Sequence, residues 1–165
     1  MIKSILLLGD EALYRPSIEV TPDELDAIRP VIKDLHDTLM DFRRKHGRGR
    51  AIAAPQIGIH KRIIYMHIES PIAILNPSLH FPDEDMMEVM DDCMSFPALM
   101  VWVMRYRRCV LRYRDMEWQP KETALEGDLA ELIQHEYDHL DGILATMRAV
   151  DNKSFYACST DSSGE

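Results

Sequence analysis

The stretch His135-Glu136-Tyr137-Asp138-His139-Leu140-Asp141 decides how this sequence folds around a functional site. Two histidines four positions apart lie one turn apart on the same face of a helix, so both imidazoles can bind one metal ion. Glu136 points about 100° away from His135 around the helix axis, which leaves its carboxylate free to reach a water molecule beside the metal. This spacing predicts a hydrolytic metal site.

The surrounding residues predict a helix over 128–140, which Asp141-Gly142 would end. Leu132 and Ile133 give this helix an apolar side, and that pattern indicates a partly buried element. Buried histidines and a buried carboxylate need partners, and a metal ion would supply them. The alternative interpretation of the motif is a solvated polar helix face.

A catalytic zinc-type site needs a third protein ligand and an open position. Cys93 is the favoured candidate, because it follows a strand-like run that ends at Met90 and precedes a Ser and a Pro. Other candidates are the Asp and Glu residues and the histidines His36, His46, His60, His67 and His80. The other two thiols, Cys109 and Cys158, are expected to be small buried side chains.

A long helix is predicted near the N-terminus. Thr21 can cap it, Glu24 completes a capping box, and Pro22 suits the first helical position. An apolar stripe follows at spacings of three and four, formed by Leu25, Ile28, Ile32, Leu35, Leu39 and Phe42. Gly47 can close the helix, and Pro30 is expected to kink it or to delay its regular start.

Short strand-like runs fill the middle of the chain: Arg62 to Ile68, Ile72 to Leu75, Glu84 to Met90, Leu99 to Met104, and Cys109 to Tyr113. Turn residues separate them, including Asn76-Pro77-Ser78 and Phe81-Pro82-Asp83. The connections are too short for helical crossovers, which favours antiparallel pairing. The order of elements predicts one α+β domain over residues 1–157, with mostly antiparallel strands packed around the C-terminal metal-binding helix. Residues 158–165 are predicted to be a mobile polar tail.

The 165 residues are 46% hydrophobic and 28% charged, as in an ordinary globular protein. A formal net charge of −9 argues against broad binding to nucleic acids or to anionic membranes. No apolar run approaches the ~18 residues of a membrane span, and the first apolar run is too short for a signal peptide. Three cysteines without paired spacing indicate a reducing compartment, so we expect a cytoplasmic protein. From its charge and its lack of a long apolar run, we expect no membrane partner and no sequence-specific nucleic-acid partner.

Three segments, in order, resemble the three signature motifs of peptide deformylases. Gly49-Arg50-Ala51-Ile52-Ala53-Ala54-Pro55-Gln56 resembles the first motif, Gly-x-Gly-Leu-Ala-Ala-x-Gln. Asp91-Asp92-Cys93-Met94-Ser95 is similar to the second motif, Glu-Gly-Cys-x-Ser. Gln134-His135-Glu136-Tyr137-Asp138-His139-Leu140-Asp141-Gly142 closely matches the third. The resemblance extends from about residue 4 to 155, nearly the whole chain.

This resemblance implies the deformylase α+β fold and removal of the formyl group from formyl-methionyl nascent peptides, or from related small N-formyl substrates, with release of formate. It implies that Cys93, His135 and His139 bind one divalent metal ion. Fe²⁺ is the expected native metal, and Zn²⁺ or Ni²⁺ would be found on purification. Glu136 would be the general acid/base.

The same resemblance implies that Gln56 and the backbone N–H of Met94 stabilise the oxyanion. The residues expected to contact the substrate are Arg50, Ala51, Ile52, Asp91, Asp92 and Leu132.

Both peptide-contacting motifs depart from the family pattern. Ala51 replaces the second Gly of the first motif and Ile52 its Leu, while Asp91-Asp92 replaces Glu-Gly in the second. Our hypothesis is that the protein keeps hydrolytic competence but has a shifted or weakened preference for formyl-methionyl peptides. The alternative is that Asp92 points to solvent without effect.

Two other functions are considered. A metallopeptidase would more often use a third His or Glu than a cysteine. A non-catalytic deformylase-like protein would bind peptides without turnover. A basic cluster of Arg105, Arg107, Arg108, Arg112 and Arg114 also allows a transient ribosome contact, although a hairpin with a basic solvent face explains it equally.

Overall fold

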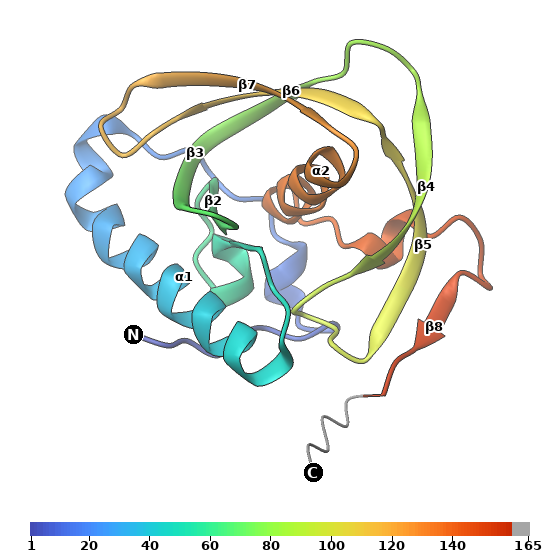
Figure 1. The fold of residues 1–165 in the computed structure, drawn as a ribbon. Coiled ribbons are helices and arrows are strands. Elements are labelled where there is room, and N and C mark those ends of the chain that lie inside the picture. Colours follow the sequence, from blue (N-terminus) through green and yellow to red (C-terminus); the bar gives the residue numbers. More distant parts are fainter. Residues whose placement is uncertain (160–165) are drawn as a thin grey trace.

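A computed structural model describes residues 1–159 of the chain. The described residues form two α-helices, α1 (Leu25–His46) and α2 (Asp128–Leu140), together with two β-sheets, and Figure 1 shows their arrangement. Every pair of neighbouring strands within the sheets is antiparallel. The predicted α+β architecture, with an N-terminal helix and strands around a C-terminal helix, is therefore confirmed.

The five-stranded sheet has the order β1-β2-β3-β6-β7, and the three-stranded sheet has the order β4-β5-β8. The strands are β1 (Ala51–Ala53), β2 (Ile63–His67), β3 (Pro71–His80), β4 (Met86–Asp92), β5 (Leu99–Tyr106), β6 (Arg108–Arg114), β7 (Pro120–Glu126) and β8 (Phe155–Ala157). Short 3₁₀ helices cover Glu11–Tyr14, Pro22–Glu24, Ala54–Ile57 and Ala145–Arg148.

Helix α2 lies in the middle of the molecule. Figure 1 shows it between the arch formed by β3, β6 and β7 and the strands β4 and β5. Ile133 and Leu140 are almost fully buried against Ile64, Ile74 and other residues of the larger sheet. Burying one such side chain contributes about 1.5–3 kcal/mol. The sheets therefore fix the position of the helix that carries the histidines.

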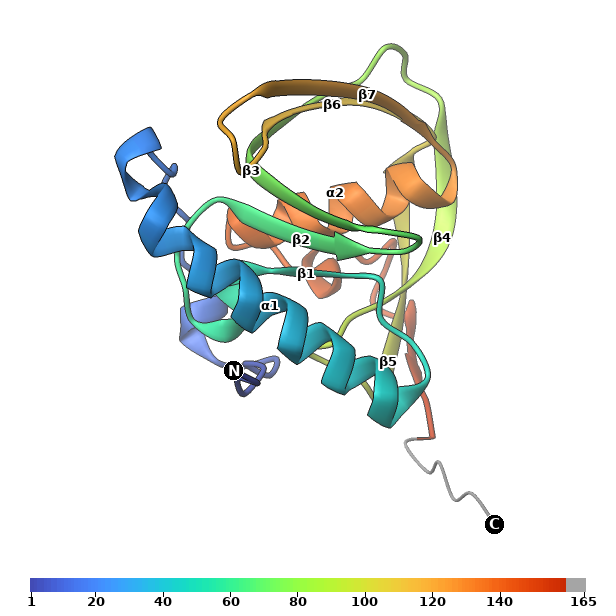
Figure 2. The same ribbon diagram turned by 60° about the vertical axis from the view of Figure 1, so that its left-hand side comes forward.

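Helix α1 covers the other side of β1 and β2, as Figure 2 shows. The expected capping box is present in part, because the Thr21 N–H donates to Glu24 Oε2 at 2.8 Å. One 3₁₀ turn precedes α1, so the regular helix starts at Leu25, later than Pro22. Gly47 ends the helix in the left-handed region, at φ 67°, as expected.

The predicted turn at Asn76-Pro77-Ser78 is wrong, because these residues lie inside β3. The register between β3 and β6 shifts between Leu75 and Ser78, which marks a bulge. Asn76 has φ 48°, and its amide exchanges two hydrogen bonds of 2.8 Å with the backbone of Val20. A bulge accommodates Pro77, which has no N–H to offer a neighbouring strand.

The basic cluster also differs from expectation, since Arg105 is buried inside the molecule. Arg107, Arg108 and Arg112 lie at the surface, and each forms ion pairs with Asp or Glu side chains. Of the predicted tail, Cys158 donates its backbone N–H to the Ala98 carbonyl, and residues 160–165 lie outside the described part of the chain. Within residues 1–159, no helix is long and apolar enough to cross a membrane.

Candidate metal centre and active site

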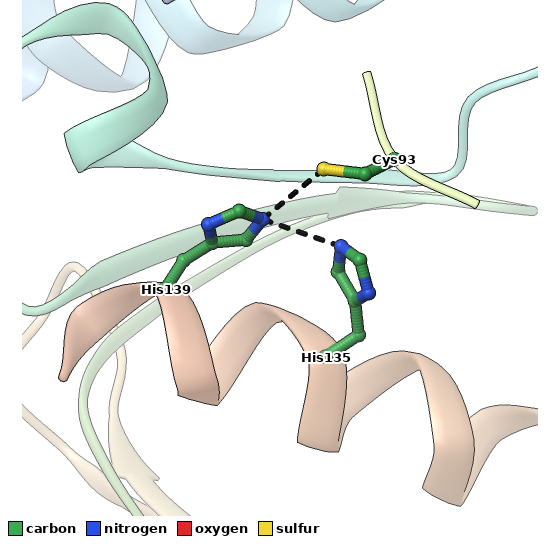
Figure 3. A group of neighbouring side chains, drawn as sticks. All are labelled: Cys93, His135 and His139. Carbon is green, nitrogen blue, oxygen red and sulfur yellow. Dashed lines mark hydrogen bonds between the residues drawn. The ribbon is translucent and has the colours of Figure 1, made fainter. Parts of the chain in front are cut away.

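Three side chains converge in the space between α2 and the end of β4. Figure 3 shows that the rings of His135 and His139 on α2 point toward the sulfur of Cys93. His139 Nε2 lies 3.3 Å from Cys93 Sγ and 3.2 Å from His135 Nε2. The helix supplies two donors because the histidines are one turn apart, and Cys93 supplies the third because it directly follows β4.

These three residues suit a divalent cation. Their donor atoms lie within 4.8 Å of one another, and all three side chains are buried. The Ser95 N–H also points to Cys93 Sγ, at 3.4 Å, which favours a negative charge on the sulfur. One thiolate with two imidazoles is a ligand set that binds zinc or iron. A metal ion bound among them would coordinate the sulfur and the two ring nitrogens, which face one another in a buried space. The residues therefore fit the expected metal.

A buried chain of alternating charges supports His135 from behind. Asp91 Oδ1 lies 2.9 Å from His135 Nδ1, and Asp91 Oδ2 accepts a 2.9 Å hydrogen bond from Arg105. Arg105 also donates to Asp138 Oδ2 at 2.5 Å, and Asp138 in turn pairs with Arg148. Asp91 and Arg105 are 2% and 3% exposed. A carboxylate on the far nitrogen fixes the ring so that Nε2 faces the site.

The pKa values of the two histidines are shifted in opposite directions. Burial alone would lower the pKa of His135, but Asp91 and Cys93 raise it well above its usual value. Burial and the neighbouring His135 lower the pKa of His139. Burial would raise the pKa of Asp91, yet His135 and Arg105 hold it below its usual range. The site thus favours one positive charge near His135, and a bound cation can replace that proton.

Glu136 faces this group from the next position on α2. Its side chain is buried, and among residues 1–159 its Oε2 atom has no hydrogen-bond partner. Burial raises the pKa of Glu136 to about 7. A carboxyl group that titrates near neutral pH can both accept and return a proton.

Gln56 lies in the 3₁₀ turn that follows β1 and is 1% exposed. Its Oε1 accepts the Ala53 N–H at 2.9 Å, which fixes the orientation of the amide. Its Nε2 donates to Ser95 Oγ at 3.1 Å and lies 3.5 Å from Cys93 Sγ. The amide N–H of Gln56, fixed in this orientation beside Cys93, can donate a hydrogen bond to a reacting oxygen on which negative charge develops.

A cavity of about 370 Å³ opens beside these groups. Most of the residues predicted to contact substrate line it: Arg50, Ala51, Asp91, Asp92 and Leu132, together with Met94. Ile52 differs, because its side chain is fully buried in the core under α1 and the residue does not line the cavity.

Three partnerships at the site have no signal in the local sequence. Arg105 was placed in a surface cluster, and nothing local to it signals the pairing with Asp91 and Asp138. Asp91 was expected to meet substrate, but its carboxylate is directed at His135 and Arg105. Arg48 pairs with Asp92, and both residues line the cavity, but no motif in the sequence indicates this pair.

The comparisons with known proteins agree with this geometry. The family model described as polypeptide deformylase matches residues 2–155. A peptide deformylase of Dictyoglomus turgidum is 32% identical over 155 residues, covering 93% of this chain and 97% of the relative.

Two solved structures share the fold. The peptide deformylase of Thermotoga maritima has a TM-score of 0.82 at 29% identity, over 92% of this chain and 99% of its own. A class I type b peptide deformylase of Acinetobacter baumannii with bound Met-Ala-Ser has a TM-score of 0.81 at 26% identity, over 90% and 98%. With a family model matching nearly its whole length and this buried cysteine–histidine group in place, the chain belongs to the polypeptide deformylase family of hydrolases.

Proposed function

We propose that this protein is a metal-dependent hydrolase that removes the formyl group from the N-terminus of N-formylated peptides and releases formate. One observation carries the proposal: Cys93, His135 and His139 converge in a buried group, with Glu136 beside them at the wall of a cavity. Family membership supports the same reaction.

The chain's own residues have distinct parts in this proposal. Glu136 takes a proton from the attacking water and passes it to the departing amine, a role typically worth ~10²–10⁴ in rate. Gln56 and the backbone N–H of Met94 donate to the oxygen of the formyl group as negative charge develops there. The bound divalent cation supplies Lewis-acid chemistry, which makes a nearby water more acidic and polarises the formyl carbonyl.

The substrate would lie in extended form between two strands. Among residues 1–159, β1 and β4 are the terminal strands of their sheets, so each has one edge without a neighbouring strand in the described structure. Ala51 of β1 and Asp91-Asp92 of β4 both line the cavity. A peptide that lay there could extend one or both sheets through backbone hydrogen bonds. The tripeptide Met-Ala-Ser bound to the Acinetobacter baumannii enzyme supports a peptide ligand.

The proposed native metal is Fe²⁺, with Zn²⁺ or Ni²⁺ as replacements, because one thiolate and two imidazoles suit all three ions. The thiolate also requires a reduced cysteine, and Cys93 is a free cysteine. We therefore propose a reducing, cytoplasmic location. A transient ribosome contact stays a prediction.

Formate release tests the proposal. Protein loaded anaerobically with Fe²⁺, and separately with Zn²⁺, should release formate from formyl-Met-Ala-Ser or from another formyl tripeptide. Glu136→Gln should bind the metal equally but lose most of this activity. Peptide binding without formate release would instead indicate a binding protein, and cleavage of internal peptide bonds would indicate a metallopeptidase.

The altered second motif enters the same assay. Asp92 lines the cavity and forms an ion pair with Arg48, and its side chain is 47% exposed. We propose that this pair shifts or weakens the preference for formyl-methionyl peptides, and Asp92→Gly tests it. Ordinary formyl-methionyl preference in both proteins would remove the proposal.

A further inference from the structure

The cavity beside the three ligands has a charged wall. Arg48, Arg50, Asp92 and Glu131 all line it, together with a few apolar groups such as Leu132. Both arginines are already engaged, because Arg48 pairs with Asp92 and Arg50 pairs with Asp128. A substrate side chain that enters this space therefore meets carboxylates and occupied guanidinium groups.

Glu131 is the group in this wall with the weakest pairing. It lies on α2 four residues before His135, so its side chain points to the same side of the helix as the ligands. The side chain is only 13% exposed, and its ion pair with Arg50 is loose, with 3.8 Å between Oε2 and Nη2. Burial and the nearby Asp91 raise the pKa of Glu131 to about 7, which reflects this poor compensation.

A side chain that fills the cavity must offer Glu131 a hydrogen bond in place of the water that it displaces. An apolar side chain would remove the remaining water from Glu131 and offer nothing in return, and a buried polar group without a partner is unfavourable. An N–H donor would instead hydrogen-bond to the carboxyl oxygen. A carboxylate would lie beside Glu131 and Asp92, with both arginines already paired.

We propose that Glu131 is a specificity-determining residue, and that the substrate side chain next to the formyl group carries N–H donors, as an amide or an ammonium does. This inference rests on the proposed deformylase function, which it makes more specific. It states that an unbranched apolar side chain such as methionine is not the best occupant of the cavity.

A panel of formyl tripeptides X-Ala-Ser tests the proposal in the metal-loaded protein, with X as Lys, Gln, Met, norleucine or Glu. The kcat/KM for Lys or Gln should exceed that for norleucine about tenfold, the effect of one uncompensated buried polar group. Glu131→Leu should invert this order, and Glu131→Gln, which keeps the shape, should reduce the preference for Lys. A faster reaction with norleucine than with Lys and Gln, unchanged in Glu131→Leu, would overturn the proposal.

Glu126→Leu is the matched control. Glu126 lies on β7, outside the cavity, and its side chain is 66% exposed. The same substitution there should leave the order of the five substrates as in the unmodified protein. If Glu126→Leu also inverted the order of the substrates, the loss of any carboxylate would produce the effect and not the loss of the one in the cavity. That result would overturn the proposal.

Binding of the deformylated products gives a readout that does not depend on turnover. Calorimetric titration of the metal-loaded protein with Lys-Ala-Ser, Gln-Ala-Ser and norleucine-Ala-Ser should show tighter binding of the first two, and Glu131→Leu should remove the difference. Equal affinities would overturn the proposal. If the affinities differ as expected while no substrate releases formate, the proposed function fails, and only the preference of this cavity for N–H donors beside Glu131 is supported.

Discussion

The substitution Arg105→Met tests the buried charge network behind the metal site. Arg105 is 3% exposed and lies between Asp91 and Asp138, at 2.9 and 2.5 Å. Methionine fills similar space but leaves the Asp91 carboxylate buried with His135 as its remaining partner. Breaking a buried pair from one side costs ~3–5 kcal/mol, because a charge remains without compensation. We expect the free energy of unfolding to fall by about that amount.

The assay is equilibrium unfolding in urea, on protein treated with a chelator so that metal binding does not contribute to stability. Arg107→Met is the control, because Arg107 is two residues away and pairs with Asp85 at 3.0 Å, but its side chain is 41% exposed. Such a surface pair is worth ~0.2–1 kcal/mol. Equal losses in the two variants would refute the argument from burial.

Three further predictions concern the ligands and Glu136. Cys93→Ala should remove one of the three donors, so the purified protein should contain far less metal by elemental analysis, and a full metal content would contradict the assignment. Glu136→Gln should lower the rate of formate release by ~10²–10⁴ at unchanged metal content. In metal-free protein, the pKa of Glu136 is raised from 4.5 to about 7, so its carboxyl group keeps the proton to a higher pH in the folded protein than in the unfolded chain. Its stabilising contribution is full below pH 4.5 and is lost as the pH rises to about 7, and Glu136→Gln should flatten this part of the stability profile measured in urea.

Local patterns predicted the parts of the fold that local interactions create. The helix over 128–140 is predictable because its apolar side and the Asp141-Gly142 end signal are adjacent in sequence. The candidate ligands His135 and His139 followed from their spacing, and Cys93 from its place after a strand and from the family resemblance. Strand β7, Pro120–Glu126, was missed because six of its seven residues are exposed and it has no apolar alternation. Its pairing with β6 holds it in place.

Contacts between distant segments account for the other differences. Asn76 reads as a turn residue, but the backbone of Val20 holds it inside β3. Arg105 reads as a surface charge, and only the packing of β5 against α2 places it between two aspartates. No pattern within a single segment carries this information.

The separation of the ligands along the chain has a consequence for assembly. Both histidines lie on α2, which packs against the five-stranded sheet, whereas Cys93 follows β4 of the three-stranded sheet. A chain whose sheets have not yet come together can offer the imidazole pair but lacks the sulfur. High-affinity metal binding would then require the finished tertiary structure, so the cation would bind late in folding and would not initiate it.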